Sequence, residues 1–141
     1  MRGFIITGTS SGIGYELCKL LLENPENKVI GISRTQNIEH TNYNHIALDL
    51  NNISEIENIE FPSWSNAAQI SLIHNAGWIG PIQKIGNQEL GAIASAYIIN
   101  LVAPTVLSNK FINMYKSSKA QKVILSVSSG AAHTPVGGWS T

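Results

Sequence analysis

The sequence contains little cysteine and little charge. Cys18 is the one cysteine among 141 residues, so no disulfide can form within the chain, as is typical of a reducing compartment. We interpret Cys18 as a buried thiol, because leucines surround it at helical spacing. Charged residues make up 13% of the chain and leave a formal net charge of +0. The sequence therefore lacks the basic surface by which proteins bind nucleic acid or anionic membranes.

Long apolar runs and targeting segments are also missing. No uninterrupted apolar run approaches the roughly 18 residues of a membrane span. The first residues match a strand and not a signal peptide. We therefore expect a cytoplasmic protein with neither nucleic acid nor membrane as a partner, and we predict no metal site.

The chain consists instead of short apolar segments that alternate with helical ones. Apolar strands are predicted at 4–6, 29–32, 45–48, 71–74 and 123–127. Helices are predicted over 12–23, 53–59 and 88–115, where Pro104 marks a kink or a first turn. Continuously apolar strands between helices favour a parallel sheet covered on both faces. We predict a doubly wound α/β sheet of the Rossmann type, forming one NAD(P)-binding domain over residues 1–141 with only the N-terminal five strands.

A glycine-rich turn follows the first predicted strand. It reads Thr7-Gly8-Thr9-Ser10-Ser11-Gly12-Ile13-Gly14. Gly8 permits a tight turn, Gly12 lets a phosphate approach the backbone, and Gly14 lets the helix pack close to the sheet. The helix that begins here directs its free N–H groups at a pyrophosphate, and the hydroxyls of the turn add donors. The turn predicts nucleotide binding, and the alternative is a Gly/Ser turn without a ligand.

The end of the second predicted strand distinguishes NADP from NAD. Ser33 and Arg34 stand there, and no acidic residue follows before Glu39. An acid at this point holds the ribose of NAD, whereas a guanidinium pairs with the 2′-phosphate of NADP. We therefore expect NADP(H) more than NAD(H), the alternative for Arg34 being a solvated loop cation. Asp49, after the third strand, can accept from the adenine amine or can simply cap a turn.

These motifs resemble the short-chain dehydrogenase/reductase family in order and spacing. The resemblance includes the glycine-rich turn together with Asp49-Leu50, His74-Asn75-Ala76-Gly77, Asn100 and Ser128-Ser129. Within the family the chain most resembles the sepiapterin reductase and benzil reductase branch, through Ser129-Gly130-Ala131-Ala132 and Gly138-Trp139-Ser140. The family usually has Asn-Asn-Ala-Gly, so His74 is a departure, and we interpret it as a packing residue at a strand end.

The resemblance implies a reaction and roles for individual residues. Asp49 and Leu50 would contact the adenine, and the segment from Asn75 to Gly77 would line the ribose side of the cofactor. Asn100 would help to hold a water in a proton relay, and Ser129 would bond the substrate carbonyl. The implied reaction is reduction of a ketone or aldehyde, a small-molecule carbonyl substrate, by NADPH. The full-length enzyme would form a homo-oligomer.

The family's acid/base pair, Tyr-x-x-x-Lys, is not in the expected place. The usual spacing from Ser129 puts that tyrosine immediately beyond Thr141, so we expect the chain to be incomplete at its C-terminal end and inactive alone. Tyr115 and Lys119 match the pattern formally but precede Ser129, and we interpret Tyr115 as part of a solvated helix terminus.

Two alternatives remain open. One is a catalytically inactive, truncated Rossmann domain that at most binds nucleotide. The other is the product of an interrupted reading frame without an independent function. A methyltransferase of similar fold is disfavoured by Asn75-Ala76-Gly77 and Ser128-Ser129.

Overall fold

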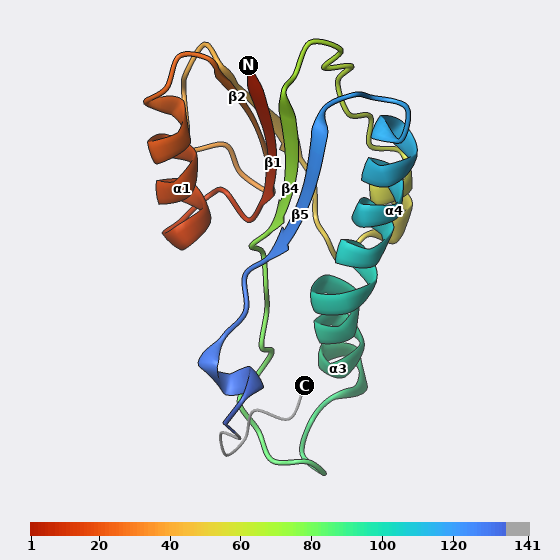
Figure 1. The fold of residues 1–141 in the computed structure, drawn as a ribbon. Helices are drawn as coiled ribbons and strands as arrows, with labels where there is room; N and C mark the ends of the chain where they lie inside the picture. Colours follow the sequence, from red (N-terminus) through yellow and green to blue (C-terminus); the bar gives the residue numbers. More distant parts are fainter. Residues whose placement is uncertain (135–141) are drawn as a thin grey trace.

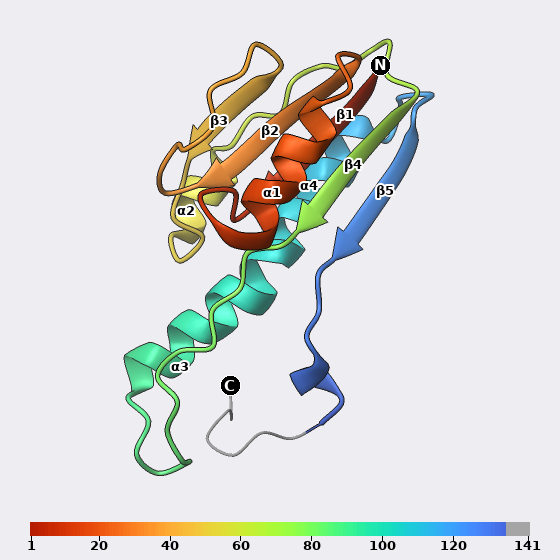
Figure 2. The same cartoon turned by 90° about the vertical axis from the view of Figure 1, so that its left-hand side faces the viewer.

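A parallel sheet of five strands organises the computed structural model, which describes residues 1–134. The strands are β1 (Arg2–Thr7), β2 (Asn27–Ser33), β3 (Tyr43–Ala47), β4 (Gln69–His74) and β5 (Gln121–Ser126). Their order is β3-β2-β1-β4-β5, and every neighbouring pair is parallel (Figure 2). The chain winds outward in both directions from β1, so the predicted doubly wound sheet is confirmed. The point where the order reverses, between β1 and β4, is where ligands bind in such sheets.

Helices cover both faces of the sheet. They are α1 (Gly12–Leu22), α2 (Ile53–Glu57), α3 (Leu90–Tyr97), a π-helical turn (Ile98–Val102), α4 (Ala103–Tyr115) and a 3-10 turn (Gly130–Ala132). Figure 1 shows α1 on one face and α4 on the other. The helices that lie between the strands along the chain therefore pack on both faces of the sheet. This is the layering that the alternating sequence pattern predicts.

The long helix predicted over 88–115 is one helical run with an irregular middle. Pro104 lies in the first turn of α4 and has no N–H, so the carbonyl of Asn100 lacks its α-helical donor four residues on. The ladder widens here into the π-helical turn, a form that is frequent at functional sites. The run Leu90–Tyr115 is long and apolar enough to cross a membrane by length and composition. Core helices of soluble proteins meet the same criterion, and α4 packs one side against the sheet.

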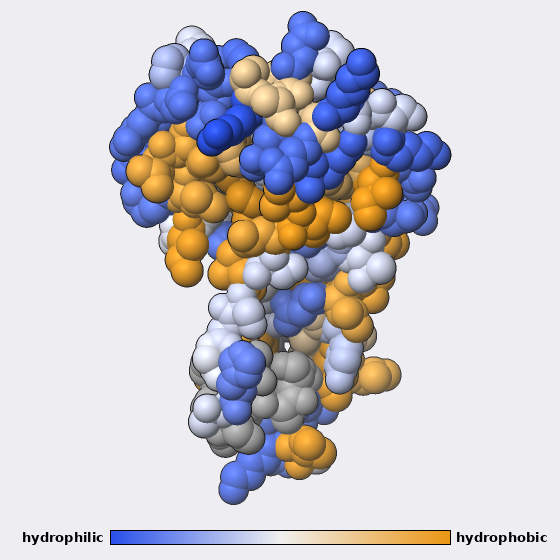
Figure 3. Space-filling view, viewed as in Figure 1, coloured by the Kyte–Doolittle hydropathy of each residue, from blue (hydrophilic) through white to orange (hydrophobic). Residues whose placement is uncertain are grey.

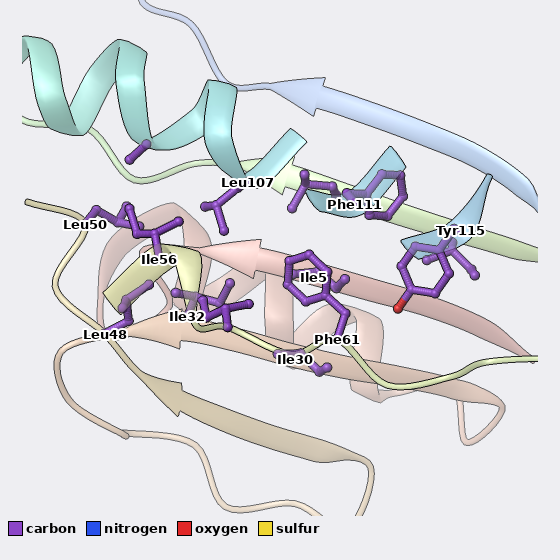
Figure 4. Close-up of a cluster of buried hydrophobic side chains, with 14 of the residues drawn as sticks. Ile5, Ile30, Ile32, Leu48, Leu50, Ile56, Phe61, Leu107, Phe111 and Tyr115 are labelled. Atoms are coloured by element: carbon purple, nitrogen blue, oxygen red, sulfur yellow. The ribbon is translucent and has the colours of Figure 1, made fainter. Parts of the chain in front are cut away.

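Two apolar clusters fill the space between the sheet and its helices. The larger lies on the α4 side and joins Ile5 and Ile32 of the sheet to Leu107 and Phe111 of α4 (Figure 4). The smaller lies under α1 and contains Cys18. Cys18 is 0% exposed, which confirms its interpretation as a buried thiol, and burial raises the pKa of this thiol to about 12. Each large side chain buried in this way contributes about 1.5–3 kcal/mol.

Tyr115 corrects one expectation. It is buried, its hydroxyl donates to the Pro62 carbonyl at 2.8 Å, and its ring stacks with that of Trp64. Tyr115 is therefore part of the larger core cluster and not of a solvated helix end. The apolar character of the residues that α4 places on its inner side, Leu107 and Phe111, carries Tyr115 into the core with them.

β5 is an edge strand with exposed apolar side chains. Ile124 is 42% exposed, Leu125 48% and Val127, just past the strand, 41%. Figure 3 shows apolar residues gathered across the middle of the face on which β5 lies. Unpaired strand edges with such side chains are surfaces on which further protein can pack.

Candidate functional site

A cleft of ≈ 620 Å³ opens at the carboxyl ends of the strands, where the sheet order reverses. This volume is typical of small-molecule sites, which run from roughly 300 to 1,000 Å³. The cleft is lined by predicted cofactor residues, namely Gly8, Ser10, Ser11, Ile13, Ser33, Arg34, Asp49, Leu50, Asn75, Ala76 and Gly77. It is also lined by residues that the sequence did not single out as site residues, namely Ile32, Leu48, Asn51, Trp78, Ser95 and Ile99. The fold therefore brings motifs that lie far apart in the sequence together around one cleft.

The glycine-rich turn has the backbone that its sequence predicts. Gly8 and Gly12 adopt φ of 74° and 61°, the left-handed region that favours glycine. Gly14 does not line the cleft, but a Cβ there would overlap the Gly8 carbonyl oxygen, so α1 packs directly on the turn. Ser11 precedes α1 and makes no side-chain capping bond, so the first N–H groups of α1 are not capped by it. This N-terminus is the arrangement that binds phosphate.

The cleft is also lined by the residues predicted to recognise the adenosine half of a cofactor. Arg34 is exposed and lines the cleft beside Ser33. Asp49 also lines it, and its Oδ1 accepts from the Asn51 N–H at 2.9 Å. One carboxylate oxygen of Asp49 therefore caps a turn, as one of the two interpretations has it, and the contact with adenine stays a prediction. The cleft lining therefore offers one cationic and one anionic side chain.

The segment after β4 is fastened to the end of β1. Thr7 Oγ1 accepts from the N–H groups of Asn75 and Ala76, both at 3.1 Å. The Asn75 side chain donates in return to the carbonyls of Thr7 and Gly8, both at 3.1 Å. Thr7 is only 1% exposed, so these bonds are shielded from water. Sequence reasoning placed Thr7 in the motif but gave it no role, since its partners follow a different strand, β4.

Asn100 lies in the π-helical turn and holds the next loop residue. Its Oδ1 accepts from the Trp78 N–H at 2.9 Å, and its Nδ2 donates to the Trp78 carbonyl at 2.6 Å. The oxygen and the nitrogen of the Asn100 side-chain amide therefore both bond to the protein backbone. Trp78 lines the cleft, so Asn100 shapes the cleft through this residue.

The other two polar residues at the strand ends differ in their surroundings. Ser129 is exposed, does not line the cleft, and accepts from the Ala131 N–H at 3.2 Å as it begins the 3-10 turn. His74 is 6% exposed, as expected of a packing residue at a strand end, and its Nε2 lies 2.8 Å from Ser108 Oγ. Burial lowers the pKa of His74, so it is neutral over a wider pH range than an exposed histidine. The motif Gly138-Trp139-Ser140 lies outside the described residues.

The described residues, 1–134, contain no group of three or more His, Cys, Asp or Glu side chains placed to hold a metal ion. The polar side chains among the residues that line the cleft carry hydroxyls, amides, an indole N–H, one guanidinium and one carboxylate. Such groups bind a nucleotide through its phosphates, ribose and base.

Known proteins resemble the chain along its whole length. The family model of the short chain dehydrogenases matches residues 3–141. The benzil reductase ((S)-benzoin forming) of Bacillus subtilis (strain 168) is 34% identical, covering 99% of this chain and 60% of that protein. The Bacillus cereus benzil reductase is 37% identical, covering 99% and 61%. The chain thus spans about three-fifths of the length of these curated relatives.

Comparison with solved structures also leads to the short-chain dehydrogenases. The crystal structure of a short-chain dehydrogenase/reductase from Burkholderia vietnamiensis superposes with a TM-score of 0.85 at 27% identity, covering 99% of this chain and 70% of that one. The family resemblance drawn from the glycine-rich turn and Asn75-Ala76-Gly77 is confirmed, and so is the benzil reductase branch inferred from the segment that begins at Ser129. The chain belongs to the short chain dehydrogenase family.

Proposed function

We propose that this chain supplies the cofactor site of an NADP-dependent oxidoreductase that reduces a carbonyl compound with NADPH. The observation that carries the proposal is the position of Arg34, on the wall of the cleft that the glycine-rich turn also lines. A guanidinium at the end of β2 matches a phosphate on the adenosine ribose, which NADP has and NAD lacks.

The residues present fit this cofactor. The left-handed Gly12 leaves open space where its side chain would be, so the turn can receive a pyrophosphate against the N-terminus of α1. Asp49 offers an acceptor to the adenine amine, and Asn75 to Gly77 stand on the side toward β4. When bound, the reduced nicotinamide supplies a hydride to the substrate carbon.

The proposed catalytic residues of this chain are Ser129 and Asn100. The Ser129 hydroxyl would hold the substrate oxygen, and it is exposed at the carboxyl edge of the sheet where a substrate can reach it. The Asn100 side chain is committed to Trp78, so we assign the water of the proton relay to the Asn100 backbone carbonyl, which Pro104 deprives of its α-helical donor. Asn100 then has two roles: its side chain is a clamp that holds the backbone of Trp78, and its backbone carbonyl accepts a hydrogen bond from the water.

The relatives support a carbonyl substrate. The two benzil reductases, at 34% and 37% identity, carry names that describe reduction of benzil to (S)-benzoin. A diaryl diketone is therefore the first substrate to test. The proton donor in this proposal is the family's Tyr-x-x-x-Lys pair.

The second candidate function is a module that binds nucleotide without turnover. Tyr115 favours it, because this tyrosine of the formal Tyr115-x-x-x-Lys119 match is buried against Trp64 and Pro62, away from the cleft. Within residues 1–134 the cleft lining contains no tyrosine. Such a chain would bind NADPH and leave it unconsumed.

A competition titration tests the proposal. The chain is loaded with NADPH, followed by its fluorescence, and displaced with adenosine 2′,5′-bisphosphate or with adenosine 5′-monophosphate. We expect the bisphosphate to displace NADPH at the lower concentration, because only it offers the 2′-phosphate to Arg34. Equal displacement by the two nucleotides would contradict the proposed 2′-phosphate site. Absence of NADPH binding would contradict the proposed nucleotide site. NADPH consumption on adding benzil separates the reductase from the binding module.

A further inference from the structure

A chain of hydrogen-bonded hydroxyl groups joins the glycine-rich turn to β2 and β3. Thr9 Oγ1 lies 3.1 Å from Tyr43 Oη and 3.2 Å from Ser33 Oγ. Ser33 Oγ lies 2.9 Å from the Thr35 carbonyl and 3.0 Å from His45 Nε2. Thr9 is 1% exposed and Ser33 8%, so water does not compete for these bonds.

The direction of each bond follows from the number of protons available. A carbonyl only accepts, so the single Ser33 proton goes to Thr35. Ser33 must then accept from both Thr9 and His45, and Thr9, having given its proton, must accept from Tyr43. Burial raises the pKa of Tyr43, which keeps the phenol protonated as a donor. The chain therefore runs from Tyr43 through Thr9 and Ser33 to the Thr35 carbonyl.

Gly31 provides the room for this arrangement. A Cβ at Gly31 would overlap Tyr43 Oη and would press on Thr9 Oγ1. Gly31 lies on β2 and pairs in register with His45 on β3, so the two strands meet at this point. Two polar side chains from different segments thus occupy the volume that a side chain at Gly31 would fill.

The last hydrogen bond of this chain joins Ser33 to Thr35, the two residues on either side of Arg34. Ser33 precedes Arg34 and Thr35 follows it, so the Ser33–Thr35 bond closes a turn around the arginine. A second tie, from Asn37 Nδ2 to the Ser10 carbonyl at 2.6 Å, fastens the following loop to the glycine-rich turn. The backbone that carries Arg34 is therefore fixed to the turn that would hold the pyrophosphate.

Two-point recognition of a phosphate by a guanidinium depends on the angle and position of the fork. We propose that the Tyr43–Thr9–Ser33 chain, joined by His45, sets the preference for a 2′-phosphorylated cofactor by positioning the Arg34 turn. This inference rests on the proposed use of NADP. Tyr43 and His45 do not line the cleft, so selectivity is governed in part by positioning residues that never touch the cofactor.

The test measures the dissociation constants of NADPH and NADH for single variants of the chain. Tyr43→Phe removes the first donor, and Thr9→Val removes the middle hydroxyl at nearly constant shape. We expect each to weaken NADPH binding about threefold to tenfold, the range of one neutral hydrogen bond, and NADH binding less than about twofold. Thr9→Ser restores the hydroxyl and should restore the wild-type ratio.

Tyr115→Phe is the matched control, because it also removes a buried tyrosine hydroxyl, bonded to Pro62 away from the cleft. It should lower stability and leave the NADPH/NADH ratio unchanged. If Tyr43→Phe and Thr9→Val weaken the binding of NADPH and NADH equally, the hydroxyl groups serve only in packing and the inference is overturned. If Tyr43→Phe does not fold, the Thr9→Val and Thr9→Ser pair decides alone.

Arg34→Asp separates this inference from the function on which it rests. If Arg34→Asp abolishes a preference for NADPH while Tyr43→Phe and Thr9→Val keep it, the positioning role is wrong and the NADP site stands. If the wild-type chain has no preference for NADPH, the proposed cofactor is wrong and the inference is overturned with it.

Discussion

The side-chain amide of Asn100 holds Trp78 by both of its backbone polar atoms, at 2.9 and 2.6 Å. This pair of bonds links the π-helical turn to the loop that follows β4. Because Trp78 lines the cleft, one amide controls the wall on the side toward β4.

Replacing Asn100 with Ala should loosen this loop. Both Trp78 backbone groups would lose their partner, and we expect the free energy of unfolding to fall by about 1–2 kcal/mol, which urea denaturation measures. Asn113→Ala is the control, because it is also an exposed helical asparagine and its amide has only a 3.5 Å contact with Asn109. A loss as small as that of the control would mean that the clamp contributes nothing.

Thr7→Val tests the fastening of β4 to β1. The variant keeps the shape of the side chain but leaves the N–H groups of Asn75 and Ala76 without an acceptor. A buried donor left in this way costs about 1–3 kcal/mol, so the urea midpoint should fall clearly. Thr7→Ser retains the oxygen and should lose less than Thr7→Val; equal losses would contradict the assigned role of the hydroxyl.

Gly14→Ala should prevent α1 from packing on the glycine-rich turn. The added Cβ would overlap the Gly8 carbonyl and the Asn75 amide, and we expect a loss of about 1–3 kcal/mol together with weaker NADPH binding. Gly91→Ala, in α3, meets no atom within 4 Å and should be neutral or stabilising. Unchanged NADPH affinity in Gly14→Ala would separate this packing from nucleotide binding.

His74 predicts part of the pH dependence of stability. Burial lowers its pKa from the ordinary 6.5, so below that pH the unfolded chain binds a proton that the folded chain resists. The free energy of unfolding should therefore fall as the pH is lowered below about 6.5. His74→Asn should reduce this slope, and His133→Asn, at an exposed histidine, controls for the loss of one imidazole. The same slope in wild type and His74→Asn would contradict the role of burial.

The sequence predicts the fold well where local pattern and topology agree. Apolar strands such as 29–32 and the turn from Gly8 to Gly14 signal their structure within a few residues, because glycine spacing and strand composition are local properties. Arg34 and Asp49 could be assigned to the cleft because the carboxyl ends of parallel strands share one edge.

Contacts between distant residues were beyond such reasoning. Thr9 and Tyr43 are joined by a bond that depends on the register of β2 and β3, and the space for it is a property of Gly31. Tyr115 ends a helix beside lysines and therefore resembles a solvated residue, although the helix turns it toward Phe111 and Trp64. Side-chain partners of this kind follow from tertiary packing, which sequence spacing does not encode.

The preference of Arg34 for a 2′-phosphate is the central claim, and the ratio of the dissociation constants of NADPH and NADH tests it most directly. Arg34→Asp should weaken NADPH binding about tenfold to a hundredfold, the range of a lost charge-assisted pair, and NADH binding much less. Arg2→Asp makes the same charge change at the opposite end of β1 and should leave the ratio unaltered. Equal losses of NADPH and NADH binding in Arg34→Asp, or none, would contradict the claim.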